Sequence, residues 1–330
     1  MATARQIFLK LFYQGKNVTD ELSEDILSFT YTENSHGEAD DVSLTLKDPD
    51  CKYMGDWQPT LDDTMKPSIV LDSGAEIQCG TFKMDDFSCS GSPTIVSFNA
   101  VSVPNNKSVR QTENTKAWQK VKLTEIAADI AGKGGLALTY TAKNDPQYDR
   151  KDQSKETDLD FLKKLCEDEG LSLKVTDSQL VIFNREELEK LGSVGTIDRV
   201  GGKVISWSSQ MQNYDTASET TVEYSDPKTG KKNSHTEKSK KKNNGGNKQK
   251  IKKRVKDKAH AERIAKAKQR EQEAKAKTMS ITIIGEKHYR AGDNVDILNF
   301  KAFDGKYFIT KVTHSTGPYT QTLELSKNAD

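Results

Sequence analysis

The 330-residue chain is predicted to adopt a β-rich α+β fold, with two small antiparallel β-barrel domains, a small α/β domain inserted between them and one charged helix. Three observations support this: short alternating apolar runs in the first and last thirds, two helix-then-strand patterns in the middle, and a segment rich in Ala, Lys, Glu, Arg and Gln. The predicted domains are 1–103, 104–195 and 196–330, and the last contains a basic loop and helix insertion at 228–277.

The first domain is predicted to consist mainly of strands. Its apolar residues alternate with polar ones over short runs, which Gly, Asn, Asp and Pro separate at a spacing typical of small barrels or sandwiches. We expect a hairpin turn at Ser90–Pro93. The predicted strands are Ile7–Tyr13, Ile26–Thr32, Asp41–Lys47, Pro67–Leu71, Ile77–Phe87 and Thr94–Val101.

The middle domain is predicted to contain two helices, each followed by a strand. In the first helix the apolar positions have the spacing of one helical face, and Gly132 with Gly134 and Gly135 ends the helix. In the second, Thr157 is the expected N-cap and Gly170 the expected stop. The predicted face of the first helix is Leu123, Ile126, Ala127, Ile130 and Ala131; that of the second is Leu159, Leu162, Leu165 and Cys166.

The last domain returns to strand periodicity. An Ala-Gly-Asp corner at Ala291–Asp293 and an Asp304-Gly305 turn separate its strands, because Asp-Gly supplies the positive φ values of short hairpins. Leu323 and Leu325 lie on one predicted face and Thr322 and Glu324 on the other. The predicted strands are Lys203–Gln210, Ala217–Tyr224, Met279–Ile284, Val295–Phe300 and Tyr307–Thr313.

The net charge of +1 conceals two opposite regions. Residues 228–277 hold 20 Lys and Arg against 5 Asp and Glu, whereas the remainder holds 30 against 44. Lys228–Lys250 has no apolar periodicity and is predicted to be a mobile loop. Residues 251–277 are predicted to form a charged helix with a thin apolar stripe. That stripe is Val255, Ala259, Ile264 and Ala267.

The basic loop is the candidate contact site for a partner. The interpretations left open are a solvated hairpin tip, a contact with an acidic neighbouring subunit or the acidic body itself, and nucleic acid. The composition does not favour specific nucleic-acid recognition, because the segment has few Arg residues and no interleaved aromatic residues for stacking on bases. The candidate residues are Lys231, Lys232, Lys240, Lys241, Lys242, Lys250, Lys252, Lys253 and Arg254.

The sequence does not predict an enzyme, a cofactor site or a metal site. Motifs for a nucleophile elbow, a phosphate-binding loop, a zinc protease and a dinucleotide fold are all missing. An acidic cluster at Glu156–Glu169 is interpreted as helix-start charges and a solvated helix end rather than a catalytic carboxylate pair. The four cysteines lack metal or redox spacing and are interpreted as reduced thiols, and the five histidines are scattered.

We expect a protein without a membrane span. No apolar run approaches the ~20 residues that a spanning helix needs. The N-terminal stretch MATARQIFLKLFYQ lacks the apolar core and cleavage site of a secretion signal.

The order of motifs near the C-terminus carries a resemblance to a known family. A charged helix (AHAERIAKAKQREQEAKA) is followed by a long strand (SITIIGE), the Ala-Gly-Asp corner, the Asp-Gly turn and YTQTLEL. This order resembles the C-terminal domain of contractile-tail hub proteins, the phage late control protein D family, which includes XkdQ-like hubs of Gram-positive prophages and tailocins. The stretches ETDLDFLKKLCEDEGLSL and AEIQCGTFKMDDFSCSGSPTIVSFNAVSVP are also similar to this family, whereas the basic loop departs from it.

The resemblance implies a structural baseplate hub of a contractile phage tail or tailocin. It implies a homotrimer in which each chain supplies two tail-tube-like barrels, so that three chains seat the six-fold tail tube above and carry the three-fold spike below. The implied partners are tube proteins, the spike and other baseplate proteins, with a tape measure protein as a further candidate. The implied location is the phage or tailocin particle, assembled in the cytoplasm of the bacterial host. The alternatives are a hub-associated peptidoglycan hydrolase and a protein that binds nucleic acid nonspecifically through the basic loop.

Overall fold

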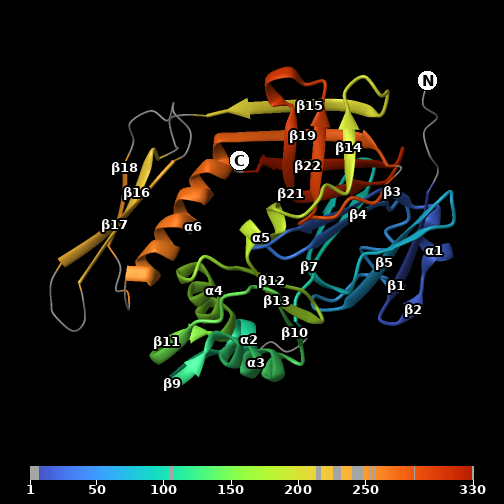
Figure 1. Cartoon of the computed structure of the whole chain (residues 1–330). Coiled ribbons are helices and arrows are strands. Elements are labelled where there is room, and N and C mark those ends of the chain that lie inside the picture. The colour runs from blue at the N-terminus through green and yellow to red at the C-terminus, as the bar shows by residue number, and fades with distance from the viewer. Residues whose placement is uncertain are drawn as a thin grey trace.

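A computed structural model gives the structure of the chain, which is rich in strands and has few helices (Figure 1). The residues that it describes are 7–104, 108–212, 217–225, 232–239, 248–252, 255, 258–285 and 287–328.

The first β unit comprises the strands up to residue 101. The strands expected from the sequence are present, except that the stretch predicted as one strand at Ile77–Phe87 is divided into β6 and β7. The division lies at Gly80, whose φ of 104° is incompatible with a continuous strand. The elements are β1 (Ile7–Tyr13), β2 (Lys16–Asn17), α1 (Thr19–Ser23), β3 (Ile26–Asn34), β4 (Asp41–Lys47), β5 (Thr64–Leu71), β6 (Glu76–Gln78), β7 (Phe82–Ser90) and β8 (Ile95–Val101).

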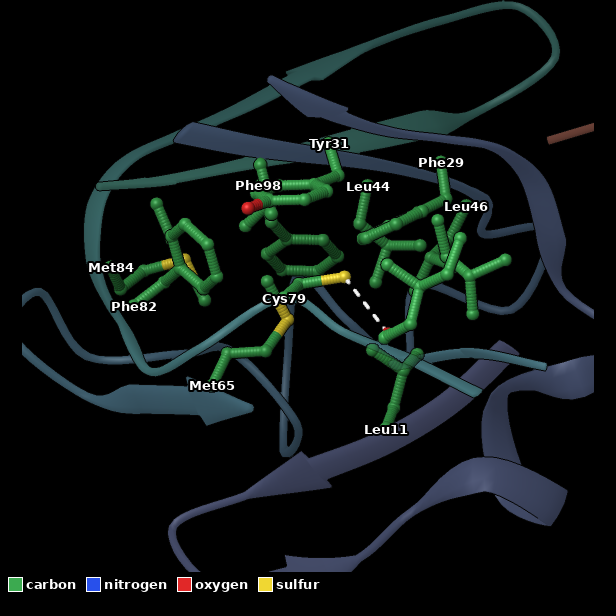
Figure 2. Close-up of a cluster of buried hydrophobic side chains, with 14 of the residues drawn as sticks. Leu11, Phe29, Tyr31, Leu44, Leu46, Met65, Cys79, Phe82, Met84 and Phe98 are labelled. Atoms are coloured by element: carbon green, nitrogen blue, oxygen red, sulfur yellow. Dashed lines mark hydrogen bonds between the residues drawn. The ribbon is translucent and has the colours of Figure 1, made fainter. Parts of the chain in front are cut away.

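The core of the first unit is aromatic and aliphatic (Figure 2). Its inward positions alternate along each strand, so that Leu44 and Leu46 of β4 face the core together with Phe29 and Phe82. Cys79 is buried among them, and its thiol donates a weak hydrogen bond to the carbonyl of Ile77 at 3.7 Å. Burial raises the pKa of the Cys79 thiol to about 12, so this cysteine behaves as a small apolar side chain.

The α/β unit packs two helices against a small sheet. The predicted apolar face of α3 is fully buried, and Gly135 ends the helix in the left-handed conformation with φ 68°. Thr157 caps α4 by accepting a hydrogen bond from the Asp160 backbone N–H, as expected. A long antiparallel ribbon of β9 and β11 was not predicted. The elements are α2 (Ser108–Gln111), β9 (Glu113–Lys122), α3 (Leu123–Gly134), β10 (Ala137–Tyr140), β11 (Gln147–Thr157), α4 (Asp158–Asp168), β12 (Ser172–Val175), β13 (Gln179–Phe183) and α5 (Arg185–Glu189).

The second β unit has its own buried core, centred on Ile281, Val295 and Tyr307. The Asp304-Gly305 prediction of a short hairpin turn was wrong in detail. Ile297 pairs with Gly305, so the connection runs over 298–304 and contains a short 3₁₀ helix. The Asp304 carboxylate accepts a hydrogen bond from Phe300 N–H across this connection, at 2.6 Å. The elements are β14 (Gly195–Asp198), β15 (Val204–Met211), β19 (Lys277–Ile284), β20 (Asn294–Leu298), η1 (Lys301–Phe303), β21 (Gly305–Ser315) and β22 (Thr320–Lys327).

The two β units share one sheet. Strand β21 pairs with β22 and, at Lys311–Ser315, with β3 of the first unit, which joins the units into a 14-stranded sheet. Its main path runs β15-β19-β22-β21-β3-β4-β8-β7-β5-β1-β2. The β-rich α+β class is confirmed, but among the described residues the pairing closes neither unit into a barrel. The sheet is open at both ends.

A buried polar group lies where the two units join. His314 of β21 is 0% exposed and stacks between Tyr31 of the first unit and Tyr319, whose hydroxyl lies 2.8 Å from His314 Nδ1. The Gln321 amide also donates to the Tyr319 hydroxyl, at 3.1 Å, and the ring of His288 meets His314 edge-on. Burial lowers the pKa of His314 to about 3, so the ring is held neutral.

A separate three-stranded sheet lies apart from the body, at the left of Figure 1, and we call it the wing. In it β16 pairs antiparallel with β17 and parallel with β18, and one face packs on α6 through Val222, Ile264 and Ala265. The wing corrects the prediction of a mobile loop at Lys228–Lys250, because part of that stretch forms strands. The predicted helix begins at Lys258 rather than near residue 251. The elements are β16 (Glu219–Ser225), β17 (Lys232–Lys238), β18 (Lys248–Lys252) and α6 (Lys258–Ala276).

Candidate assembly surfaces

The main path of the 14-stranded sheet ends in exposed edges at β15 and at β1 with β2; β14 and β6, which lie off this path, are further edge strands. At one end, β15 hydrogen bonds only to β19 among the described strands. At the other, β1 pairs with β5 along its whole length on one side, while β2 covers only Phe12 and Tyr13 on the other. An exposed strand edge offers backbone N–H and C=O groups to another chain, so each end is a candidate assembly surface.

Strand β15 carries large apolar side chains that the described chain leaves exposed. Trp207 and Met211 are 46% and 60% exposed, although their cross-strand neighbours place them on the core face of the sheet. Trp207 pairs with Ile281, which is fully buried, and its ring packs edge-on against Phe300 at 5.2 Å. Ile205, beside a register shift, is 56% exposed. The core face of the sheet therefore extends onto β15, where no described segment of the chain covers Trp207 and Met211.

Strand β1 has a comparable feature on its outer face. Leu11 points into the core, so the even-numbered residues of this strand point outward. Phe8 and Phe12 are 66% and 37% exposed and flank Lys10 on that face. Two exposed phenylalanines beside a partly unpaired edge form the second apolar surface.

The structure describes three of the nine residues of the predicted basic site. Lys250 and Lys252 lie on β18, and Lys232 begins β17. The remaining six lie outside the described residues: Lys231, Lys240, Lys241, Lys242, Lys253 and Arg254. The site is thus built in part on a sheet rather than on an irregular loop.

The outer face of the wing is basic. The register places Lys238 of β17 and Lys250 of β18 on the face opposite α6, in line with Glu219 and Thr221 of β16. Lys248 pairs with Glu219 at 2.8 Å yet stays 63% exposed, and Lys250 is 67% exposed at 3.9 Å from Glu223. Lys252 lies on the same face and is exposed. Four lysines on this face therefore outnumber two glutamates.

Helix α6 pairs its cations with the acidic body. Arg263 donates two hydrogen bonds to Glu169 at the end of α4, at 2.8 and 3.1 Å. Lys266 lies 3.2 Å from Glu186, and Arg270 contacts both Glu186 and Glu189 of α5.

The low pKa of Glu186 and the close packing at Gly170 both support the contact between α6 and the acidic body. Burial opposes ionisation of Glu186, but the bonds from Lys190 and Lys266 and the charge of Arg270 prevail and lower its pKa to about 2. Gly170 lets α4 approach the helix, because a Cβ there would lie 2.7 Å from Ala267 Cβ. The cations of α6 therefore contact acidic residues of the body of the same chain.

A lysine whose side chain is 16% exposed joins the α/β unit to the first β unit. Lys174 of β12 lies 3.1 Å from the Asp40 carboxylate and 3.7 Å from that of Glu33, and it donates to the carbonyl of Asn34 at 2.8 Å. Glu33 also accepts from the backbone N–H of Ala291 in the second β unit, at 3.2 Å. The Lys174 ammonium thus joins the α/β unit to the first β unit, and Glu33 links this pair to the second β unit.

The acidic residues at 156–169 have structural partners. Asp158 is 1% exposed and accepts hydrogen bonds from Gln153 at 2.8 Å and Asn114 at 3.2 Å, with Lys133 at 3.3 Å. Glu169 is paired with Arg263. These contacts favour a structural role for these two carboxylates.

A cleft of about 950 Å³ lies between the α/β unit, α6 and the second β unit. Its walls include Glu169, Arg185 and Arg270, whose charges already have partners. Within the described residues no group of three or more His, Cys, Asp or Glu side chains is arranged to hold a metal ion. No described helix is long and apolar enough to span a membrane.

The exposed apolar residues of β15 and β1 were not singled out from the sequence. Both strands satisfy the alternation rule for a half-buried sheet, so nothing in their pattern marks an uncovered face. The available signal was composition, since Trp207 and Met211 occur in a strand that contains several serines.

Comparison with known proteins identifies the family of this chain. A family model described as "Phage tail baseplate hub (GPD)" matches residues 84–319. Probable baseplate hub proteins of Escherichia phages 186 and P2 are 24% and 26% identical over 175 and 177 residues, which cover 52% of this chain and 44% of each relative. The matched part thus spans less than half the length of these relatives.

Solved structures share the fold over nearly the whole chain. The tail protein from Neisseria meningitidis MC58 superimposes with a TM-score of 0.76 at 14% identity and covers 98% of this chain and 97% of its own. The 43 kDa tail protein of prophage MuSo2 from Shewanella oneidensis has a TM-score of 0.73 at 15% identity, covering 96% and 97%. The Escherichia coli c3393 protein, a component of the type VI secretion system, has a TM-score of 0.58 at 13% identity, covering 93% and 74%.

These findings confirm the resemblance drawn from the C-terminal motifs. The residues that the family model matches run in chain order from within β7 to just beyond the end of β21, and they include the whole α/β unit and the wing. Because that stretch is well over half of the 330 residues, the chain belongs to the phage tail baseplate hub (GPD) family.

Proposed function

We propose that three copies of this chain form the ring-shaped hub of a contractile tail baseplate, which adapts the six-fold tail tube to the three-fold spike. Each chain supplies two ring positions, its first and second β units, within the proposed domains 1–103, 104–195 and 196–330. Three chains then offer six comparable positions to the tube. The proposed location is the baseplate of a phage or tailocin particle, assembled in the host cytoplasm.

The observation that carries this proposal is the pair of exposed edges on one continuous sheet. Strand β15 with Trp207 and Met211 lies at one end, and β1 with Phe8 and Phe12 lies at the other. Two different surfaces at opposite ends of a protomer form head-to-tail contacts, and such contacts close into a ring when the rotation between protomers permits. The edge of one protomer would then cover the apolar face that the next one exposes.

Solution mass tests the contact. We expect the wild-type chain at high concentration to sediment as a trimer, and Trp207→Ser with Met211→Ser to shift it to monomer. Phe8→Ser with Phe12→Ser should have the same effect. Leu191→Ser is the matched control, because Leu191 is 58% exposed but lies on neither edge strand. A trimer that survives both edge variants unchanged would contradict the proposed contact.

A further inference from the structure

The charges of the chain are divided between its two ends. Residues 228–277 carry the excess of Lys and Arg, and the wing that they help to form lies at one end of the molecule (Figure 1). Residues 1–103 contain 17 Asp and Glu against 7 Lys and Arg, and their strands β1 and β2 with α1 lie at the opposite end. The protomer is therefore electrostatically polar along its length.

The cations of the basic region have two different environments. Those on α6 are satisfied within the protomer by Glu169, Glu186 and Glu189. Those on the outer face of the wing point away from α6, and Lys248, Lys250 and Lys252 stay exposed at every second position of the edge strand β18. This face has no aromatic residue among its described positions, so it offers charge without a stacking platform for bases.

The acidic end presents exposed carboxylates around α1. Asp20 and Glu21 occupy the first turn of this short helix and Glu24 follows it, all exposed. The nearby loop after β4 adds exposed Asp50 and Asp56, and Lys52 of that loop reaches the carbonyl of Glu21 at 3.4 Å. We call these five residues the acidic corner.

Chain connectivity places both surfaces beside the proposed ring contact. The wing follows β15 directly in the sequence, and Gln212 at the end of β15 donates to the carbonyl of Ala276 at the end of α6. Three residues of the acidic corner, Asp20, Glu21 and Glu24, follow β1 and β2 directly. A head-to-tail contact between β15 and β1 therefore brings the wing of one protomer towards the acidic corner of the next.

We infer that the outer face of the wing docks on the acidic corner of a second copy of this chain. This inference rests on the proposed ring, and it adds the electrostatic clamp that selects the head-to-tail orientation. Head-to-head contacts would oppose two basic wings or two acidic corners, and like-charge contacts are disfavoured. Acidic surfaces of other proteins and nucleic acid are the competing occupants that the tests distinguish.

Charge reversal tests the pairing. Lys248→Glu, Lys250→Glu and Lys252→Glu together should raise the trimer dissociation constant at least about tenfold at low ionic strength, and less when salt screens the contact. Asp20→Lys, Glu21→Lys and Glu24→Lys should do the same, and combining both sets should restore assembly. Lys120→Glu, Lys143→Glu and Lys155→Glu form the control, because they change the same charge at exposed positions of the α/β unit.

Cross-linking between lysines and the native cysteines is an independent test. Cys51 is an exposed thiol beside Asp50 in the acidic corner, and Cys89 is an exposed thiol elsewhere on the first β unit. An amine-to-thiol cross-linker applied to assembled particles should join Lys248–Lys252 of one chain to Cys51 of another in preference to Cys89. Isotope-labelled and unlabelled chains mixed before assembly identify the intermolecular products.

The outcomes separate the inference from the proposed ring. A trimer that is indifferent to both charge reversals, with wing cross-links that reach other proteins or nucleic acid but never Cys51, overturns the inference and leaves the ring standing. A chain that is monomeric in solution and present as single copies in particles refutes the ring itself. Loss in each reversal with recovery in the combination establishes the docking.

Discussion

Acid should weaken the junction between the two β units through His314. The ring is 0% exposed, and burial lowers its pKa from 6.5 to about 3. In the unfolded chain the ring takes up a proton as the pH falls below 6.5, whereas in the folded protein it stays neutral until about pH 3. Protonation of His314 in the unfolded chain therefore does not oppose folding above pH 6.5, and it lowers the free energy of unfolding progressively as the pH falls from 6.5 to about 3.

The size of the effect follows from linkage. One group that protonates only in the unfolded chain costs about 1.4 kcal/mol per pH unit, so lowering the pH from about 7 to about 5 should cost about 2 kcal/mol through His314. His36 and His288, whose pKa values burial lowers to about 4, change stability in the same direction. These three histidines together therefore give a steeper pH dependence of stability than His314 alone.

His314→Gln isolates the contribution. Glutamine keeps an acceptor for the Tyr319 hydroxyl but does not titrate, so the variant changes the pH slope independently of its baseline stability. We expect urea unfolding, followed by tryptophan fluorescence at several pH values, to show a loss between about pH 7 and about pH 5 that is smaller by about 2 kcal/mol in the variant. Equal losses in wild type and variant would refute a neutral, buried His314.

Two further changes test the contacts that hold the α/β unit and α6 in place. Gly170→Ala should destabilise the protein by about 1 to 3 kcal/mol, because Gly170 has a φ of 71° and an added Cβ would lie 2.7 Å from Ala267. Gly15 has a similar φ of 76° but open space around it, so Gly15→Ala should show only the smaller backbone cost. Equal urea midpoints for the two variants would exclude the close approach. Lys174→Met should lower the free energy of unfolding by about 3 to 5 kcal/mol, because it leaves the carboxylates of Glu33 and Asp40 together without a cation. Lys190→Met removes an ion pair whose lysine is 69% exposed, so it should lower that free energy by less than about 1 kcal/mol. A small effect at Lys174 would show that this junction is not held by charge.

The local elements were predictable because local rules decide them. Strands β1, β3, β4 and β8 follow their apolar alternation, and α3 and α4 follow their spacing and the cap at Thr157. The family itself was recognisable from the order of motifs at the C-terminus.

Long-range pairing was not predictable from the same patterns. The junction of β21 with β3 joins residues far apart in the chain, and no local signal in either strand specifies its partner. That pairing is the reason two expected barrels form one open sheet.

The basic segment shows where composition misleads. The lysine-rich sequence between Lys232 and Lys252 has low apolar content, which favours a loop. The sheet is nevertheless held on α6, because Val222 and Ile251 pack against the few apolar residues of that helix. Of the candidate site, the sequence predicted the charge and the helix but not the surface that presents the lysines. The exposed Trp207 and Phe8 were missed because exposure depends on which strands end the sheet.

An image of the purified particle at a resolution that traces strands tests the central claim most directly. We predict three copies of this chain around the tail axis, with β15 of each copy against β1 of the next and six β units facing the tube. A different copy number, or three copies whose β15 and β1 edges both face solvent, would contradict the proposed hub.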